Sequence, residues 1–140
     1  MKGLSIYLSE PITDETSEWL QRMSAVGFTS LFTSLHIPED DSSLYVERLK
    51  ALGHLARELG FELVADIAPA SLATLGKTWE TAATLTDWGV TGLRLDYGIS
   101  PQQIATLSNQ MMVALNASTL TADELTEMKA QGLRLSLIHI

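Results

Sequence analysis

Five short segments of the chain alternate between aliphatic and polar side chains, and this alternation constrains the fold more than any other feature. They are residues 4–9, 30–36, 62–66, 93–97 and 113–118. Because successive side chains of a β-strand point to opposite faces, each segment predicts a strand with one aliphatic face and one polar face. The aliphatic face suits packing under helices, and the polar side chains collect toward the strand ends.

Helix signals separate these strands. Thr13 can cap a helix whose first turn carries Asp14 and Glu15. Gly27 is expected to end this helix. Its apolar stripe is predicted to be Trp19, Leu20, Met23 and Val26.

Four more helical regions are expected from signals of the same kind. They run from Ser42 or Ser43 to Gly60, from Ser71 to Trp88 with a break around Gly76, from the Ser100–Gln103 capping box onward, and from Thr121 to Gly132. Strand and helix alternate five times, which predicts parallel strands joined by right-handed crossovers.

The fold class is therefore α/β, and two architectures compete for it. Five βα units do not close a TIM barrel, which needs eight and about 250 residues, so the chain would form part of one. A flavodoxin-like open sheet also uses five units, but its strands are covered on both faces and form continuous apolar runs. Here one face carries Ser, Tyr, His, Arg, Asp and Asn, which favours the partial barrel.

Composition narrows the classes of function. The chain has 140 residues, enough for one domain, and no cysteine, which excludes disulfides and thiolate metal sites. Its formal net charge is −8 and its nine lysines and arginines are scattered, which argues against a nucleic-acid surface. No apolar run approaches the roughly 20 residues of a membrane helix, and the amino terminus lacks the pattern of a signal peptide. These features are compatible with a cytoplasmic protein.

Five motifs at the strand ends occur together and in order. They are residues 6–11 (IYLSEP), 27–40 (GFTSLFTSLHIPED), 64–69 (VADIAP), 92–98 (GLRLDYG) and 115–119 (LNAST). With these motifs, residues 3–134 resemble the amino-terminal part of the bacterial 6-phospho-N-acetylmuramidase family of TIM-barrel glycosidases. The resemblance implies a cytoplasmic hydrolase without a cofactor. Its small phosphorylated amino-sugar substrate would be the disaccharide of 6-phospho-N-acetylmuramic acid and N-acetylglucosamine, cleaved during cell-wall (peptidoglycan) recycling.

Members of this family look complete only with three further βα units and a smaller carboxy-terminal domain. We therefore expect residues 1–134 to be a truncated barrel domain that holds part of an active site and is inactive by itself. Residues 135–140 (LSLIHI) depart from the family and match what a common sequencing adapter encodes when read in frame, so we expect them not to be native. The alternative is a genuine sixth strand, because the tract is strongly β-forming.

Two carboxylates that end aliphatic strands are the first candidates for catalysis. Asp66 and Asp96 each precede a short loop. Glycoside hydrolysis commonly needs one protonated and one ionised carboxyl group. The alternative is that one of them caps the next helix or pairs with Arg94. Glu10 is a third candidate, although strand parity turns it away from the polar face unless its loop rotates it.

Six further polar side chains are candidates for substrate binding: Tyr7, Ser34, His36, Arg94, Asn116 and Ser118. Asn116 and Ser118 suit sugar hydroxyls or an acetamido group, and His36 could donate to an anion or act as an acid or base. Arg94 could equally form a structural ion pair inside the barrel, and Tyr7 could equally fill it. No metal site is expected, because His36 and the acidic residues after it are a weak ligand pattern.

Two other functions stay open at this point. A lyase or aldolase acting on phosphosugars would share the fold, but no lysine lies at a strand end, which counts against Schiff-base chemistry. A non-catalytic open-sheet module that binds a partner would have helices over the polar face. No membrane or nucleic-acid partner is expected, and the sequence sets no oligomeric state.

Overall fold

A six-stranded parallel sheet forms the centre of the computed structural model, which describes residues 2–35, 42–95, 100–116, 123, 126 and 136–138. The strands are β1 (Gly3–Ser5), β2 (Ser30–Ser34), β3 (Glu62–Ile67), β4 (Gly92–Leu95), β5 (Met112–Asn116) and β6 (Ser136–Ile138). Their order in the sheet is β1-β2-β3-β4-β5-β6, and every neighbouring pair is parallel. This sequential order confirms the prediction of a partial barrel and contradicts the central reversal of a flavodoxin-like sheet.

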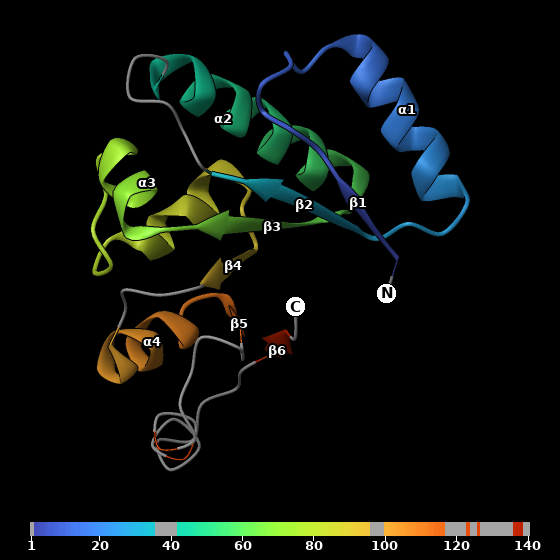
Figure 1. Cartoon of the computed structure of the whole chain (residues 1–140). Coiled ribbons are helices and arrows are strands. Elements are labelled where there is room, and N and C mark those ends of the chain that lie inside the picture. Colours follow the sequence, from blue (N-terminus) through green and yellow to red (C-terminus); the bar gives the residue numbers. More distant parts are fainter. Residues whose placement is uncertain are drawn as a thin grey trace.

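Helices connect the first five strands at the places that the sequence predicts, and the helix expected from Thr121 to Gly132 lies outside the described residues except at 123 and 126 (Figure 1). They are α1 (Asp14–Ala25), α2 (Ser42–Leu59), α3 (Pro69–Thr74), the 3₁₀ helix η2 (Ala82–Trp88) and α4 (Pro101–Ser108). The capping box of α4 is confirmed: Ser100 Oγ accepts from the Gln103 amide at 3.2 Å, and Gln103 Oε1 accepts from the Ser100 amide at 3.0 Å. The capping box expected at residues 121–124 lies outside the described residues, apart from Asp123.

Several predicted boundaries are wrong by a few residues. The first strand was expected to reach residue 9, but β1 ends at Ser5, and only the Ile6 amide continues the pairing, with 2.8 Å to the Phe32 carbonyl oxygen. The third helical region begins at Pro69, because proline suits the first turn of a helix. The break around Gly76 is confirmed, since its φ of +73° is left-handed and the chain resumes only as a 3₁₀ helix.

The predicted apolar stripe of α1 is wrong at its end. Leu20 is fully buried and Trp19 packs partly against the core, but Val26 is 58% exposed. The helix ends at Ala25, so Val26 is the C-cap residue and not a member of the helical stripe that would place it near Trp19 and Met23.

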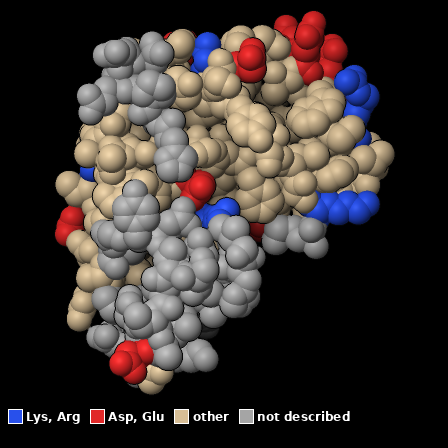
Figure 2. All heavy atoms as spheres, in the orientation of Figure 1, with Lys and Arg blue, Asp and Glu red and all other residues tan. Residues whose placement is uncertain are grey.

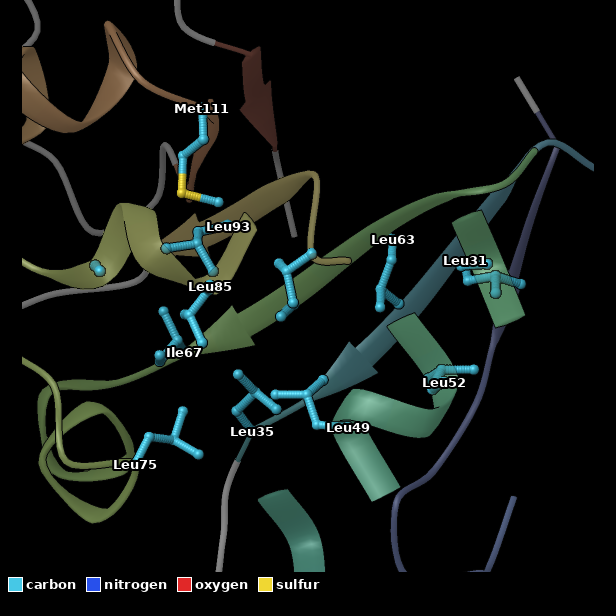
Figure 3. Packing of buried hydrophobic residues seen from close by; sticks show 14 of the residues in the cluster. Leu31, Leu35, Leu49, Leu52, Leu63, Ile67, Leu75, Leu85, Leu93 and Met111 are labelled. Carbon is cyan, nitrogen blue, oxygen red and sulfur yellow. The ribbon is translucent and has the colours of Figure 1, made fainter. Parts of the chain in front are cut away.

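The aliphatic face of the strands is buried, as predicted. Seven side chains of this face on β2, β3, β4 and β5 are at most 1% exposed: Leu31, Leu63, Ala65, Ile67, Leu93, Leu95 and Val113. Among them, Figure 3 shows Leu31, Leu63, Ile67 and Leu93 on the side of the sheet that faces leucines of α2 and η2, namely Leu49, Leu52 and Leu85. The core therefore lies between one face of the sheet and the helices.

No described helix covers the opposite, polar face of the sheet (Figure 1). On it Phe32 is 38% exposed and Met112 is 39% exposed, and Tyr7 just beyond β1 is 68% exposed. Helices over both faces would bury these side chains. The described helices cover the other face (Figure 1), so the open-sheet alternative does not fit. Among the described residues, no helix combines the length and apolar character needed to cross a membrane.

Candidate active site

A pocket of about 160 Å³ opens on the polar face, at the carboxyl ends of the first strands. Its described lining consists of Ser5, Ile6, Tyr7, Phe32, Thr33, Ser34, Val64, Asp66 and Arg94. Four of these were predicted from the sequence as site residues, namely Tyr7, Ser34, Asp66 and Arg94. The strand-end positions that lie far apart in the sequence thus come together in one hollow, at the edge of the sheet where barrel enzymes carry their active sites.

Strand register places three of these side chains in one row. Ser34 of β2 is the register partner of Asp66 of β3, and Asp66 is the partner of Arg94 of β4. Neighbouring strands lie about 4.8 Å apart, so a carboxylate has a hydroxyl on one side and a guanidinium on the other. In Figure 2 the described part of this face is mostly uncharged, with one acidic and one basic side chain adjoining near the middle.

The charged pair of the row is half-buried rather than solvated. Asp66 and Arg94 are both of intermediate exposure. The Nε atom of Arg94 is buried and has no hydrogen-bond partner among the described residues. A desolvated N–H without an acceptor is unfavourable, so an oxygen of a bound molecule would find a ready donor at this position.

Below the polar row lies a mostly apolar floor. Ser5, Phe32 and Val64 are register partners one step toward the amino ends of the strands. The Phe32 ring covers Gly3, where an added Cβ would lie 2.9 Å from its Cδ2 atom. Phe32 shares the parity of Ser34 and His36 in the sequence, but it was not among the predicted site residues. The pocket therefore combines an aromatic and aliphatic floor with a polar rim, a composition typical of small-molecule sites.

Glu10 is not part of this pocket. It is exposed in the loop after β1, and its amide lies 3.4 Å from the carbonyl oxygen of Tyr7. The loop does not turn its side chain into the described pocket lining, so its catalytic role stays a prediction.

Four other predicted site residues are not placed by the structure. Asp96, His36 and Ser118 lie outside the described residues, and Asn116 is described only as the last residue of β5. Their roles also stay predictions. Within the described part of the chain, no group of three or more His, Asp or Glu side chains is arranged to hold a metal ion.

The sequential parallel strands, the open polar face and the pocket at the strand ends define an α/β protein of the TIM-barrel type. Residues 2–139 match the sequence model described as "6-phospho-N-acetylmuramidase, N-terminal", so the chain belongs to that family. The resemblance noted in the sequence is thereby confirmed. Among curated proteins, none matches the chain significantly.

Solved structures share the fold of this chain. A conserved protein of unknown function from Enterococcus faecalis superposes with a TM-score of 0.87 and 40% identity, over 99% of this chain and 39% of that one. The chain thus spans about two fifths of the length of this relative.

Two distant structures share the fold alone. A Burkholderia cenocepacia protein described as a lyase/mutase has a TM-score of 0.61 at 15% identity, over 97% of this chain and 54% of its own. The N-terminal domain of a protein described as an aldolase, from Bacteroides vulgatus, has a TM-score of 0.62 at 10% identity. The match covers 99% of this chain and 48% of that one.

Proposed function

We propose that the chain is the amino-terminal part of a cytoplasmic glycoside hydrolase of cell-wall recycling. Its substrate would be the disaccharide of 6-phospho-N-acetylmuramic acid and N-acetylglucosamine. Family membership over residues 2–139 supports the class of reaction. The observation that carries the assignment to this face is the row of Ser34, Asp66 and Arg94 in one pocket.

Asp66 has the surroundings that a catalytic carboxyl group needs. It is half-buried at the end of β3, beside the guanidinium of Arg94 and above an apolar floor. Glycosidases pair one carboxyl that gives a proton with another that acts as base or nucleophile. We assign the role of base or nucleophile to Asp96. It directly follows β4 in the sequence, one residue after Leu95, which is the register partner of Ile67 of β3.

Arg94 and Ser34 are assigned to substrate binding. The buried Nε–H of Arg94 suits an oxygen of the sugar, and the Ser34 hydroxyl can both donate and accept. The floor of Phe32 and Val64 suits the carbon-bound face of a sugar ring. Phosphate sites of barrel enzymes often follow strands seven and eight, so these residues are not assigned to the phosphate group.

The lyase or aldolase alternative is less well supported. None of the described pocket residues is a lysine, so the pocket offers no amine for a Schiff base. The two distant relatives described in those terms are at most 15% identical and bear on the fold only.

A binding and turnover experiment tests the proposal. The 140-residue chain is titrated with N-acetylmuramic acid 6-phosphate by calorimetry, and it is assayed on the phosphorylated disaccharide beside the longer Enterococcus faecalis protein. We expect the chain to bind without turnover, and the longer protein to release both sugars. Asp66→Asn should weaken binding, whereas Asp87→Asn, exposed in η2, serves as the matched control. Hydrolysis by neither protein and binding by neither would contradict the proposal.

A further inference from the structure

An arginine outside the pocket reaches the loop that forms one of its walls. Arg48 of α2 is half-buried, and its Nη1 donates a hydrogen bond of 2.8 Å to the carbonyl oxygen of Leu8. Leu8 lies between β1 and α1, 40 positions earlier in the chain. Hydrogen bonds from an ionised donor are stronger than neutral ones, so this contact ties the loop firmly to the helix.

The bonded carbonyl belongs to the centre of a tight turn. The Glu10 amide points back to the Tyr7 carbonyl oxygen at 3.4 Å, which closes a four-residue turn over residues 7–10. Leu8 is the second residue of this turn, so its carbonyl is not used by the turn itself. The common turn types differ by a flip of this central peptide, which reverses the direction of that carbonyl. A donor fixed on α2 therefore selects one of the two orientations.

The two sides of Tyr7 are held by different contacts. Before it, the Ile6 amide donates to the Phe32 carbonyl oxygen at 2.8 Å. After it, the Leu8 side chain is 2% exposed in the core, and the Leu8 carbonyl is held by Arg48. Tyr7 itself is 68% exposed and lines the pocket. Of these contacts, only that of Arg48 fixes the orientation of the central peptide.

Among the described residues Arg48 forms no ion pair, and the Leu8 carbonyl is its one hydrogen-bond acceptor there. Arg57, on the same helix, makes the same kind of bond elsewhere: its Nη2 donates to the Thr86 carbonyl oxygen at 2.9 Å, away from the candidate site. Arg57 does not line the site pocket, which makes it a matched control of like chemistry.

We infer that Arg48 is a positioning residue of the active site, which holds the turn of residues 7–10 so that Tyr7 forms a wall of the sugar pocket. The inference deepens the proposed function and rests on it for the identity of the ligand. Arg48 does not line the pocket itself and acts on the bound sugar only through the turn.

Two measurements on the 140-residue chain test this role. The first is ¹⁵N relaxation of the amides of residues 8–10 in the wild type, Arg48→Met, Arg48→Lys and Arg57→Met. In Arg48→Met, the order parameters of the turn should fall from about 0.85 to below about 0.6, with those of β3 unchanged. Arg48→Lys keeps a cationic donor and should restore part of the order, and Arg57→Met should leave the turn as in the wild type.

The second measurement is the affinity for N-acetylmuramic acid 6-phosphate by calorimetry. Arg48→Met should lower it roughly 10- to 100-fold, the range set by losing a charge-assisted hydrogen bond, and Arg57→Met should not lower it. An unchanged turn, equal loosening of β3, or a loosened turn with wild-type affinity would each overturn the inference. If the wild type does not bind the phosphosugar, the proposed function fails, and the relaxation data alone decide whether Arg48 positions the turn.

Discussion

Gly53 of α2 and Gly89, which follows η2, lie in direct backbone contact. A Cβ added at Gly53 would overlap the carbonyl oxygen of Trp88, and one added at Gly89 would lie closer than 3 Å to the Gly53 backbone. Gly89 also has a left-handed φ of +92°, which side chains rarely adopt. These two glycines let η2 pack against α2 at a distance that no side chain would allow.

Gly53→Ala should therefore destabilise the protein, although helix propensity alone predicts a gain of about 1 kcal/mol. The new methyl group meets backbone atoms that cannot rotate away, and overpacking of this kind typically costs about 1–3 kcal/mol. Urea denaturation measures the free energy of unfolding. Ala51→Gly, on the exposed side of the same helix, measures the helix-propensity contribution alone and should lose about 1 kcal/mol. A more stable Gly53→Ala variant would show that α2 and η2 can move apart freely.

Arg94→Met should weaken the binding of N-acetylmuramic acid 6-phosphate by about tenfold or more. The substitution removes the buried Nε–H donor from the pocket but keeps an unbranched side chain of similar length. Calorimetric titration of the 140-residue chain measures the change. Arg22→Met, on the exposed surface of α1, is the control and should bind as the wild type does. Equal affinities would assign Arg94 to the structural ion pair that the sequence also allows.

The sheet could be predicted from the sequence because its signal repeats. Period-two alternation gives both the buried face of Leu31, Leu63 and Leu93 and the polar row of Ser34 and Asp66, since the pleat leaves no other arrangement. The sequential strand order followed from the polar second face, which an open sheet covered on both sides would not tolerate.

The end of a helix, a long-range hydrogen bond and an aromatic pocket residue could not be predicted from this alternation. Val26 continues the helical period in the sequence, but α1 ends one residue earlier. Arg48 gave no signal, because a side chain that binds a backbone carbonyl 40 positions away leaves no local pattern. Phe32 was not predicted as a site residue, because aromatic side chains are common in strands and first suggest a place in the core.

Asp96→Asn should lower turnover by at least about 100-fold in the full-length parent protein that we propose. Acid–base catalysis by a positioned carboxyl group typically supplies about 10²–10⁴ in rate, and asparagine keeps the shape while losing the proton transfer. The assay is release of N-acetylglucosamine from the phosphorylated disaccharide, with circular dichroism to show that the variant is folded. Near-normal turnover by a folded variant would give Asp96 a structural role.

Removal of residues 135–140 should improve solubility and leave the rest of the fold unchanged. The tract holds β6, which pairs with β5 over three positions, and it is mostly apolar at the edge of the sheet. An apolar edge strand invites association between chains, in addition to that expected from the open face around Phe32 and Met112.

The matched control for this deletion keeps the full length and replaces Leu137 and Ile138 with serine, which removes apolar character without shortening the chain. Light scattering measures particle size, and urea denaturation measures stability. We expect both variants to be less associated than the wild type and equally stable. A deletion that lowers the free energy of unfolding, while the serine variant does so less, would show that β6 is a native strand of the sheet and that the adapter interpretation of these residues is wrong.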